Sequence, residues 1–280
     1  MIVSNQRLGV TILELMMAVA VVAMLMVALA GLSMTIQDGA KFNQGYGEAA
    51  QHARVVKARV TRTVNAATAT EDYPGAIVVD ETVGGWQFPD TLVVWSPETG
   101  NPAAATIGPL VSELVVYMPN PDAPNELWEL TERSNTGRAL SDTEANDWVT
   151  SSTLTGWKTT VASMVASPAS HKVVLTDLLR IGSTSLINET GEGLWRGCLR
   201  FESAMNPARW DWDGYQGGSW PWEEISFAQG IRGSQTGLRQ VWVRFEFQLQ
   251  PGHSSGAGDS AVMPPLLFFG SAAIYYEMHR

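Results

Sequence analysis

One short pattern in the chain has the spacing of a serine-hydrolase nucleophile. The pentapeptide GHSSG, residues 252–256, follows a predicted strand and matches the Gly-x-Ser-x-Gly turn that would present Ser254 at the start of a helix. The next residues, AGDSAVMPP, are rich in Gly and Pro and cannot begin that helix. Too few residues follow to supply an acid and a histidine in that order. We therefore expect a surface loop and no enzymatic activity.

The possible metal ligands are also too scattered to form a site. Cys198 is the only cysteine, so the chain has neither an internal disulfide nor a Cys-x-x-Cys pair. The histidines do not have metal-ligand spacing with one another; they are His52, His171, His253 and His279. No cofactor is expected.

A single carboxylate lies in a long apolar run near the N-terminus. From Val10 to Met34 the sequence reads VTILELMMAVAVVAMLMVALAGLSM, and Glu14 is its only charged residue. At about 1.5 Å per residue such a helix crosses the roughly 30 Å of membrane hydrocarbon. The run exceeds the about 7 to 15 apolar residues of a cleaved secretory signal. Because a carboxylate there is costly without a partner, we expect a retained membrane helix with a specific role for Glu14.

The residues before this run are similar to a known processing signal. The short leader MIVSNQRLG ends at Gly9, and Glu14 is the fifth residue after it. This arrangement resembles the class III signal of type IV prepilins and type II secretion pseudopilins. The resemblance implies that a prepilin peptidase cuts between Gly9 and Val10 on the cytoplasmic side, and that the new amino group of Val10 is N-methylated. The chain departs from the usual pattern in having Val10 where phenylalanine is most common.

The resemblance also implies a role in assembly for Glu14 and a set of partners. Glu14 of one subunit would pair with the amino group of Val10 of a neighbour, where scarce water strengthens the attraction. The alternative is a local interaction with the N-terminus of its own helix, whose dipole favours negative charge. The implied partners are prepilin peptidase, other major and minor pilins or pseudopilins, the inner-membrane assembly platform and membrane lipid.

The next segment, residues 37–70, has the pattern of an amphipathic helix that packs on a head domain. Apolar residues recur at steps of three and four, namely Tyr46, Ala49, Ala53, Val56, Val60 and Val64. The opposite face carries Arg54, Lys57 and Arg62. This basic face is either solvated, in contact with another subunit, or bound to anionic lipid.

From about Tyr73 the sequence changes from a helical pattern to strands. Apolar and β-branched runs are separated by turn residues; they are AIVVD, TLVVWS, ELVVYM, ELWELT, HKVVLTDLL, WRGCLRFE, QVWVRFEFQLQ and AAIYYEMH. Between them, the segment from Arg133 to Pro168 predicts a helix-and-loop insertion. The fold class is therefore α+β, with a long N-terminal helix and a mostly antiparallel, pilin-like head.

An acidic balance and a tryptophan-rich segment characterise this head. The chain has a net charge of −10, and nucleic-acid binding is therefore not expected. The segment RWDWDGYQGGSWPWEE brings together Trp210, Trp212, Tyr215, Trp220 and Trp222. It either packs on its own domain, contacts a protein or polysaccharide partner, or uses Asp211 and Asp213 in a calcium loop.

These observations predict four regions and a function. Residues 1–9 form a leader, 10–36 a transmembrane and filament helix, 37–70 the amphipathic helix, and 71–280 a periplasmic head. We expect a single-pass protein of the bacterial inner membrane that becomes part of a filament. By resemblance it is a minor pilin or pseudopilin, of the J or W type, which helps initiate or cap the filament. The alternative is a membrane-anchored envelope binding protein or enzyme that does not assemble.

Overall fold

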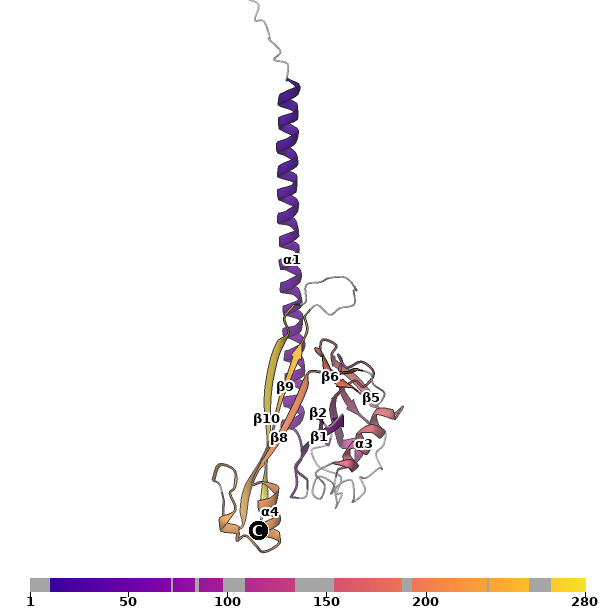
Figure 1. The fold of residues 1–280 in the computed structure, drawn as a ribbon. Helices are drawn as coiled ribbons and strands as arrows, with labels where there is room; N and C mark the ends of the chain where they lie inside the picture. The colour runs from indigo at the N-terminus through magenta and orange to yellow at the C-terminus, as the bar shows by residue number, and fades with distance from the viewer. Residues whose placement is uncertain are drawn as a thin grey trace, which may run out of the picture. The chain divides into compact units, whose positions relative to one another are not determined.

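The computed structural model describes residues 11–71, 73–83, 86–97, 109–133, 154–187, 193–230, 232–251 and 263–280. Gly9, Val10 and Ser254 lie outside these residues, as does part of the expected insertion after Arg133. The chain divides into two compact units, Met1–Gly47 and Glu48–Arg280. The first holds most of the long helix α1, and the second contains its last turns and all of the strands (Figure 1).

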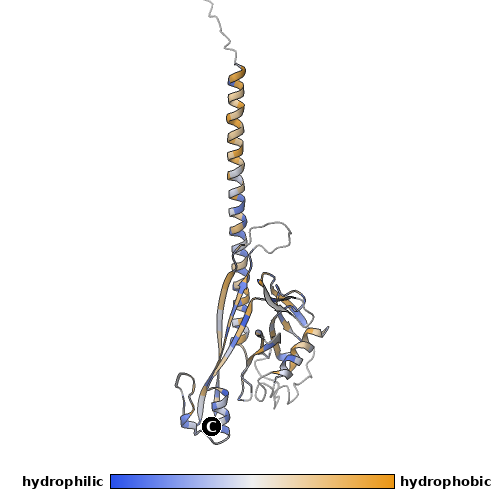
Figure 2. Cartoon of the chain, viewed as in Figure 1, coloured by the Kyte–Doolittle hydropathy of each residue, from blue (hydrophilic) through white to orange (hydrophobic). Residues whose placement is uncertain are grey.

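Helix α1 runs without interruption from Ile12 to Asn65. It is long and apolar enough to cross a membrane, and Figure 2 shows the apolar residues gathered along its first part. Gly31, Gly39 and Gly47 do not break it, although each lowers helix propensity by about 1 kcal/mol relative to alanine. The long apolar N-terminal helix predicted from the sequence is confirmed.

Within the second unit, the last turns of α1 form one side of the core. The predicted apolar stripe is buried from Ala49 onward: Ala49, Ala53, Val56, Val60 and Val64 are each at most 3% exposed, whereas Tyr46, at its start, is only half-buried. Because these residues recur every three or four positions, they lie along one face of the helix. They pack against apolar side chains of both larger sheets, including Leu92, Tyr117, Phe201 and Phe245.

The larger sheet has five antiparallel strands in the order β1-β2-β3-β4-β5. They are β1 Ala76–Val83, β2 Trp86–Trp95, β3 Leu114–Pro119, β4 Leu127–Thr131 and β5 His171–Thr176. A short 3-10 helix, η1, precedes β3 at Val111–Glu113. Helix α3, Thr155–Ala166, packs Trp157, Val161 and Met164 into a second core cluster with Val93, Trp95 and Val116. The sheet is therefore covered on both faces.

The second sheet has three antiparallel strands in the order β10-β9-β8, namely β8 Leu199–Asn206, β9 Thr236–Leu249 and β10 Leu266–His279. β9 and β10 pair over fourteen consecutive positions without a register shift. In β9 the alternate residues Val241, Val243, Phe245 and Phe247 are buried, as the alternating sequence predicts. A hairpin of β6, Ile181–Ile187, and β7, Gly193–Gly197, completes the strands. The predicted α+β class with a mostly antiparallel head is confirmed.

Between β8 and β9 the tryptophan-rich segment folds into short helices. Helix α4 spans Arg209–Gln216, and the 3-10 helices η2 and η3 span Trp222–Glu224 and Ala228–Gly230. Gly214, Gly217 and Gly218 are poor helix formers, so the local sequence favours a loop here. The helix forms where Trp212 becomes buried, so tertiary packing outweighs the weak local propensity.

Candidate functional site

The first turn of α1 contains a reciprocal capping arrangement between Thr11 and Glu14. The backbone N–H of Thr11 donates to Oε2 of Glu14 at 3.2 Å, and the N–H of Glu14 donates to Oγ1 of Thr11 at 3.3 Å. The threonine hydroxyl is also within 3.3 Å of the same carboxylate oxygen. This is the Thr-x-x-Glu capping box, which satisfies N–H groups that the helix itself leaves unpaired. Within a single chain Glu14 therefore interacts with the N-terminus of its own helix, which is the alternative to its pairing with Val10 of a neighbour.

The helix that follows exposes an apolar surface on all sides. Consecutive side chains from Met24 to Val27 are each at least 58% exposed, and Ile12 reaches 80%. Four consecutive residues cover the whole circumference of a helix at 3.6 residues per turn. An apolar surface of this extent requires lipid or neighbouring apolar helices around it. The first unit thus contains a helix whose length and composition allow it to cross a membrane.

A partly buried polar network connects the last turns of α1 to the larger sheet. Nε and Nη2 of Arg59 donate to the two carboxylate oxygens of Glu129 at 2.8 and 3.0 Å. The hydroxyl of Tyr117 donates to Glu129 at 3.1 Å and lies 2.7 Å from the hydroxyl of Thr63. The bond and charge of Glu129 raise the pKa of Arg59, and burial raises the pKa of Tyr117. Such bidentate, charge-assisted contacts fix orientation as well as contributing energy.

Of the five aromatic residues singled out in the sequence, two are buried. Trp212 and Trp222 are 5% and 2% exposed and form a small core cluster with Phe227 and Met278. The indole N–H of Trp222 donates to the carbonyl of Gly233 at 2.9 Å. These two residues pack on their own domain, as one of the three sequence interpretations had it. Tyr215 is half-buried beside them.

The other two tryptophans form an exposed pair. Trp210 is 66% and Trp220 is 42% exposed, and their ring centroids lie 6.4 Å apart in an edge-to-face arrangement. Trp220 sits against Gly214, where an added Cβ would come within 1.9 Å of the indole ring. The indole ring of Trp220 therefore packs closely over Gly214. An exposed aromatic pair is the kind of surface that often dominates protein interfaces.

The acidic residues beside these tryptophans do not gather into a cation site. Asp213 forms an ion pair with Arg209 across one helical turn, with Nε and Oδ2 3.1 Å apart. Within the described part of the chain, no group of three or more His, Cys, Asp or Glu side chains could hold a metal ion. The geometry thus supports packing for Trp212 and Trp222 and a contact surface for Trp210 and Trp220.

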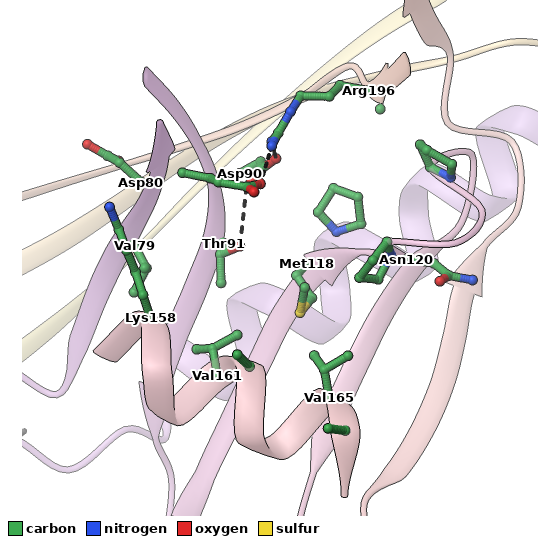
Figure 3. Close-up of a pocket in the computed structure, with 17 residues that line it drawn as sticks. Val79, Asp80, Asp90, Thr91, Met118, Asn120, Lys158, Val161, Val165 and Arg196 are labelled. Carbon is green, nitrogen blue, oxygen red and sulfur yellow. Dashed lines mark hydrogen bonds and ion pairs between the residues drawn. The ribbon is translucent and has the colours of Figure 1, made fainter. Parts of the chain in front are cut away.

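A cavity of about 640 Å³ lies between α3 and the larger sheet (Figure 3). Val79, Met118, Val161 and Val165 contribute apolar walls. Its charged lining residues, which the sequence alone did not single out, are Asp80, Glu81, Asp90, Lys158 and Arg196. The cavity therefore offers apolar contact beside charged groups.

Asp90 and Arg196 form the buried ion pair of this cavity. Nη1 of Arg196 donates to Oδ2 of Asp90 at 2.6 Å, and Nη2 contacts Glu81. Burial nevertheless raises the pKa of Asp90 to about 6, because the desolvation of its carboxylate outweighs the attraction of Arg196, a cation shared with Glu81.

Comparison of the chain with family models, with curated proteins and with solved structures gave no match. Its resemblance to the prepilin family rests on the N-terminal residues alone.

Proposed function

We propose that this chain is a minor pilin or pseudopilin subunit of a type II secretion or type IV pilus-like envelope filament. It is processed by prepilin peptidase between Gly9 and Val10 and helps initiate or cap the filament. The observation that carries the proposal is the placement of Glu14, the only charge of the apolar run, in the first turn of α1. The α+β architecture, with its long N-terminal helix, is consistent with a pilin-like subunit.

The capping box suggests how Glu14 serves two states of the subunit. In a single chain its carboxylate is satisfied by Thr11 and by the helix N-terminus. After cleavage, the amino group of Val10 on a neighbouring subunit competes for this carboxylate. A charge-assisted bond between ammonium and carboxylate is stronger than the neutral bonds it replaces, and it gains further where water is excluded. Assembly thus exchanges a local cap for a contact between subunits.

The head is attached to this helix in a way that suits a filament subunit. Five apolar residues of the stripe and the Arg59–Glu129 pair hold the last turns of α1 within the second unit. A subunit that is pulled or rotated through its helix needs such a connection, because the helix and the head must move together. The exposed pair Trp210 and Trp220 is then available to contact another minor subunit or an exported protein.

One observation favours the alternative, an anchored envelope binding protein that does not assemble. The cavity between α3 and the larger sheet is large enough for a small ligand or a side chain of a partner. In that case Glu14 acts only as a helix cap, and its charge has no role in assembly.

Substitution of Glu14 by glutamine separates the helix-capping role of this residue from the role of its charge in assembly. Glutamine at this position preserves the capping box but removes the charge. We expect Glu14→Gln to remain in the inner membrane of the native host, while its incorporation into sheared filaments falls about tenfold or more. Thr11→Ala is the matched control, because it weakens the cap by about 1 kcal/mol and keeps the charge. Incorporation of Glu14→Gln at the parental level would contradict the proposed pairing with Val10.

A further inference from the structure

A fully buried arginine lies beneath helix α4. Arg239 of β9 is 1% exposed. Cζ of its guanidinium lies 5.5 Å from the ring centroid of Trp212 on α4 and 5.9 Å from that of Tyr276, its cross-strand partner on β10. Figure 1 shows α4 at the end of the three-stranded sheet, beside the C-terminus. A charge removed from water in this way is costly unless an opposite charge or hydrogen bonds compensate it.

The hydrogen bonds of Arg239 satisfy only one side of its guanidinium. Nη1 donates to the hydroxyl of Tyr276 at 3.0 Å. Nε and Nη2 are buried, and neither has a hydrogen-bond acceptor within the part of the chain that the structure describes. The two ring faces attract the positive charge, but they do not accept its in-plane N–H groups. The compensation of this buried charge is therefore incomplete.

The two N–H groups without an acceptor form the edge of the guanidinium that binds carboxylates elsewhere in this chain. Nε and Nη2 of Arg59 donate to the two oxygens of Glu129 at 2.8 and 3.0 Å. The same two atoms of Arg209 hold Asp213 at 3.1 and 3.4 Å. In both pairs, two parallel N–H groups match the two oxygens of one carboxylate. Arg239 has the same donor edge, and no carboxylate of the described residues is bonded to it.

The described carboxylates beside Arg239 already have other donors. Asp213 pairs with Arg209 at the start of α4. Glu71 accepts the backbone N–H of the last residue of β10 at 2.8 Å. Burial raises the pKa of Tyr276, the charges of Arg239 and Arg209 lower it, and the charge of Glu71 raises it, so these groups surround one phenol. A counter-charge for Arg239 must therefore be supplied from elsewhere.

We propose that Arg239 binds a small organic monocarboxylate beneath α4, through Nε and Nη2. The surroundings are apolar, because Trp212, Trp222, Phe227 and Met278 form a core cluster here. One guanidinium balances the single charge of a carboxylate, whereas the second charge of a phosphate would stay uncompensated in these surroundings. A small molecule suits an enclosed site, because a protein segment would have to remain threaded beneath the helix. This inference does not depend on the proposed filament function.

Helix α4 covers the site and moves to admit the ligand. It has only eight residues, and its first turn has no side-chain cap. Gly214 within the helix and Gly217 at its end also lower its stability. Short helices of this kind are marginally stable by themselves, and such segments open at a low cost in free energy. Opening of α4 uncovers Arg239 while β9 and β10 remain paired.

Thermal unfolding of the full chain in detergent tests the site with sodium acetate as the probe. Sodium chloride controls for ionic strength, and acetamide controls for a neutral molecule of the same shape. A ligand that binds only the folded state raises the melting temperature. We expect acetate, at an about tenfold excess over its dissociation constant, to raise the melting temperature by roughly 4 °C. Neither control should do so, and sodium phosphate at equal ionic strength should have a smaller effect than acetate.

Two substitutions of Arg239 and one matched substitution elsewhere assign the effect to this side chain. Arg239→Lys keeps the charge but lacks the two-pronged donor edge, so the response to acetate should be lost. Arg239→Met should also lose the response, and in chloride it should melt at or above the parental temperature, because it removes an incompletely compensated charge. Arg59→Met should melt several degrees lower, because Glu129 is left without its cation, but it should keep the response to acetate.

Several results would overturn the proposal. A response to acetate no greater than the response to acetamide, or an equal response in both Arg239 variants, would show that no carboxylate binds at this edge. A larger response to phosphate than to acetate would overturn the choice of ligand. A melting temperature of Arg239→Met well below that of the parent chain would show that Tyr276 and the aromatic rings already compensate the charge.

Discussion

Asp90 and Glu129 are both buried carboxylates with an arginine partner, but their surroundings differ. Glu129 accepts two bonds from Arg59 and a third from Tyr117. Asp90 shares Arg196 with Glu81, which leaves one positive charge for two carboxylates. Burial therefore raises the pKa of Asp90 to about 6, from an ordinary value of 3.8. The larger sheet thus holds a carboxyl group that takes up a proton near pH 6.

The stability of the head should depend on pH through Asp90. Its folded-state pKa lies above the unfolded value, so the folded state holds the proton more tightly. The resulting stabilisation is complete below about pH 4 and is lost as the pH rises through about 6. The free energy of unfolding of the parent chain should fall by roughly 2 kcal/mol between pH 4 and pH 7, and Asp90→Asn should abolish this decrease.

Denaturant unfolding of the full chain in detergent at several pH values measures this effect. Asp122→Asn, at an exposed position, is the matched control and should keep the pH dependence of the parent chain. If Asp90→Asn and the parent chain lose stability equally between pH 4 and pH 7, then Arg196 keeps Asp90 charged and the assigned pKa is wrong.

At the residue level, the sequence can indicate a contact only where the spacing along the chain carries the information. Thr11 and Glu14 are three residues apart, so a helix that begins there brings them together. Arg59 and Glu129 are seventy residues apart and belong to a helix and a strand. Neither residue differs locally from many other charged residues of the chain. Only the packing of α1 on β4 makes them partners.

At the level of elements, segments with a clear apolar pattern were predicted well, and two segments that lack such a pattern were not. The stripe along α1 and the alternation in β9 are confirmed, because each repeats over many residues. β6, with the sequence IGSTSLI, was missed because its small polar residues resemble a loop. Helix α4 was missed because its sequence, RWDWDGYQ, favours a turn. Its position depends on the aromatic cluster beneath it rather than on local preference.

The two classes of tryptophan around α4 should respond differently to removal. Trp222 is 2% exposed, so Trp222→Ala should cost about 3 to 5 kcal/mol of stability. For a unit of this size, the melting temperature should fall by roughly 10 °C. Trp210 is 66% exposed, and Trp210→Ala should change stability by no more than about 0.5 kcal/mol.

Thermal unfolding of the full chain in detergent, followed by circular dichroism, distinguishes these two cases. Similar decreases for both variants would show that Trp210 also belongs to the packed cluster and would remove it from the proposed contact surface. A small effect of Trp222→Ala would instead indicate that the cluster of Trp212, Trp222 and Phe227 contributes little to the stability of the head.

At the scale of the whole molecule, the chain combines an apolar helix with an acidic, strand-rich unit. From Glu71 onward the sequence contains 12 basic and 25 acidic residues. The second unit has its own core, built from the last turns of α1 and two sheets. The sequence predicted boundaries after residues 36 and 70, where hydropathy and charge change, whereas the two compact units meet between Gly47 and Glu48. The order of the strands and the cavity beside α3 depend on long-range pairing and could not be predicted.

The central claim is that this chain is processed as a prepilin, and intact-mass analysis tests it most directly. The protein is isolated from the inner membrane of its native host, and its N-terminus is confirmed by sequencing. The account predicts a chain that begins at Val10, carries a methyl group on its amino terminus and lacks residues 1–9. Gly9→Ala should instead accumulate as the uncut form, because the added side chain disturbs the backbone that the peptidase reads. A parent chain that still begins at Met1, in a host that processes other prepilins, would contradict the account.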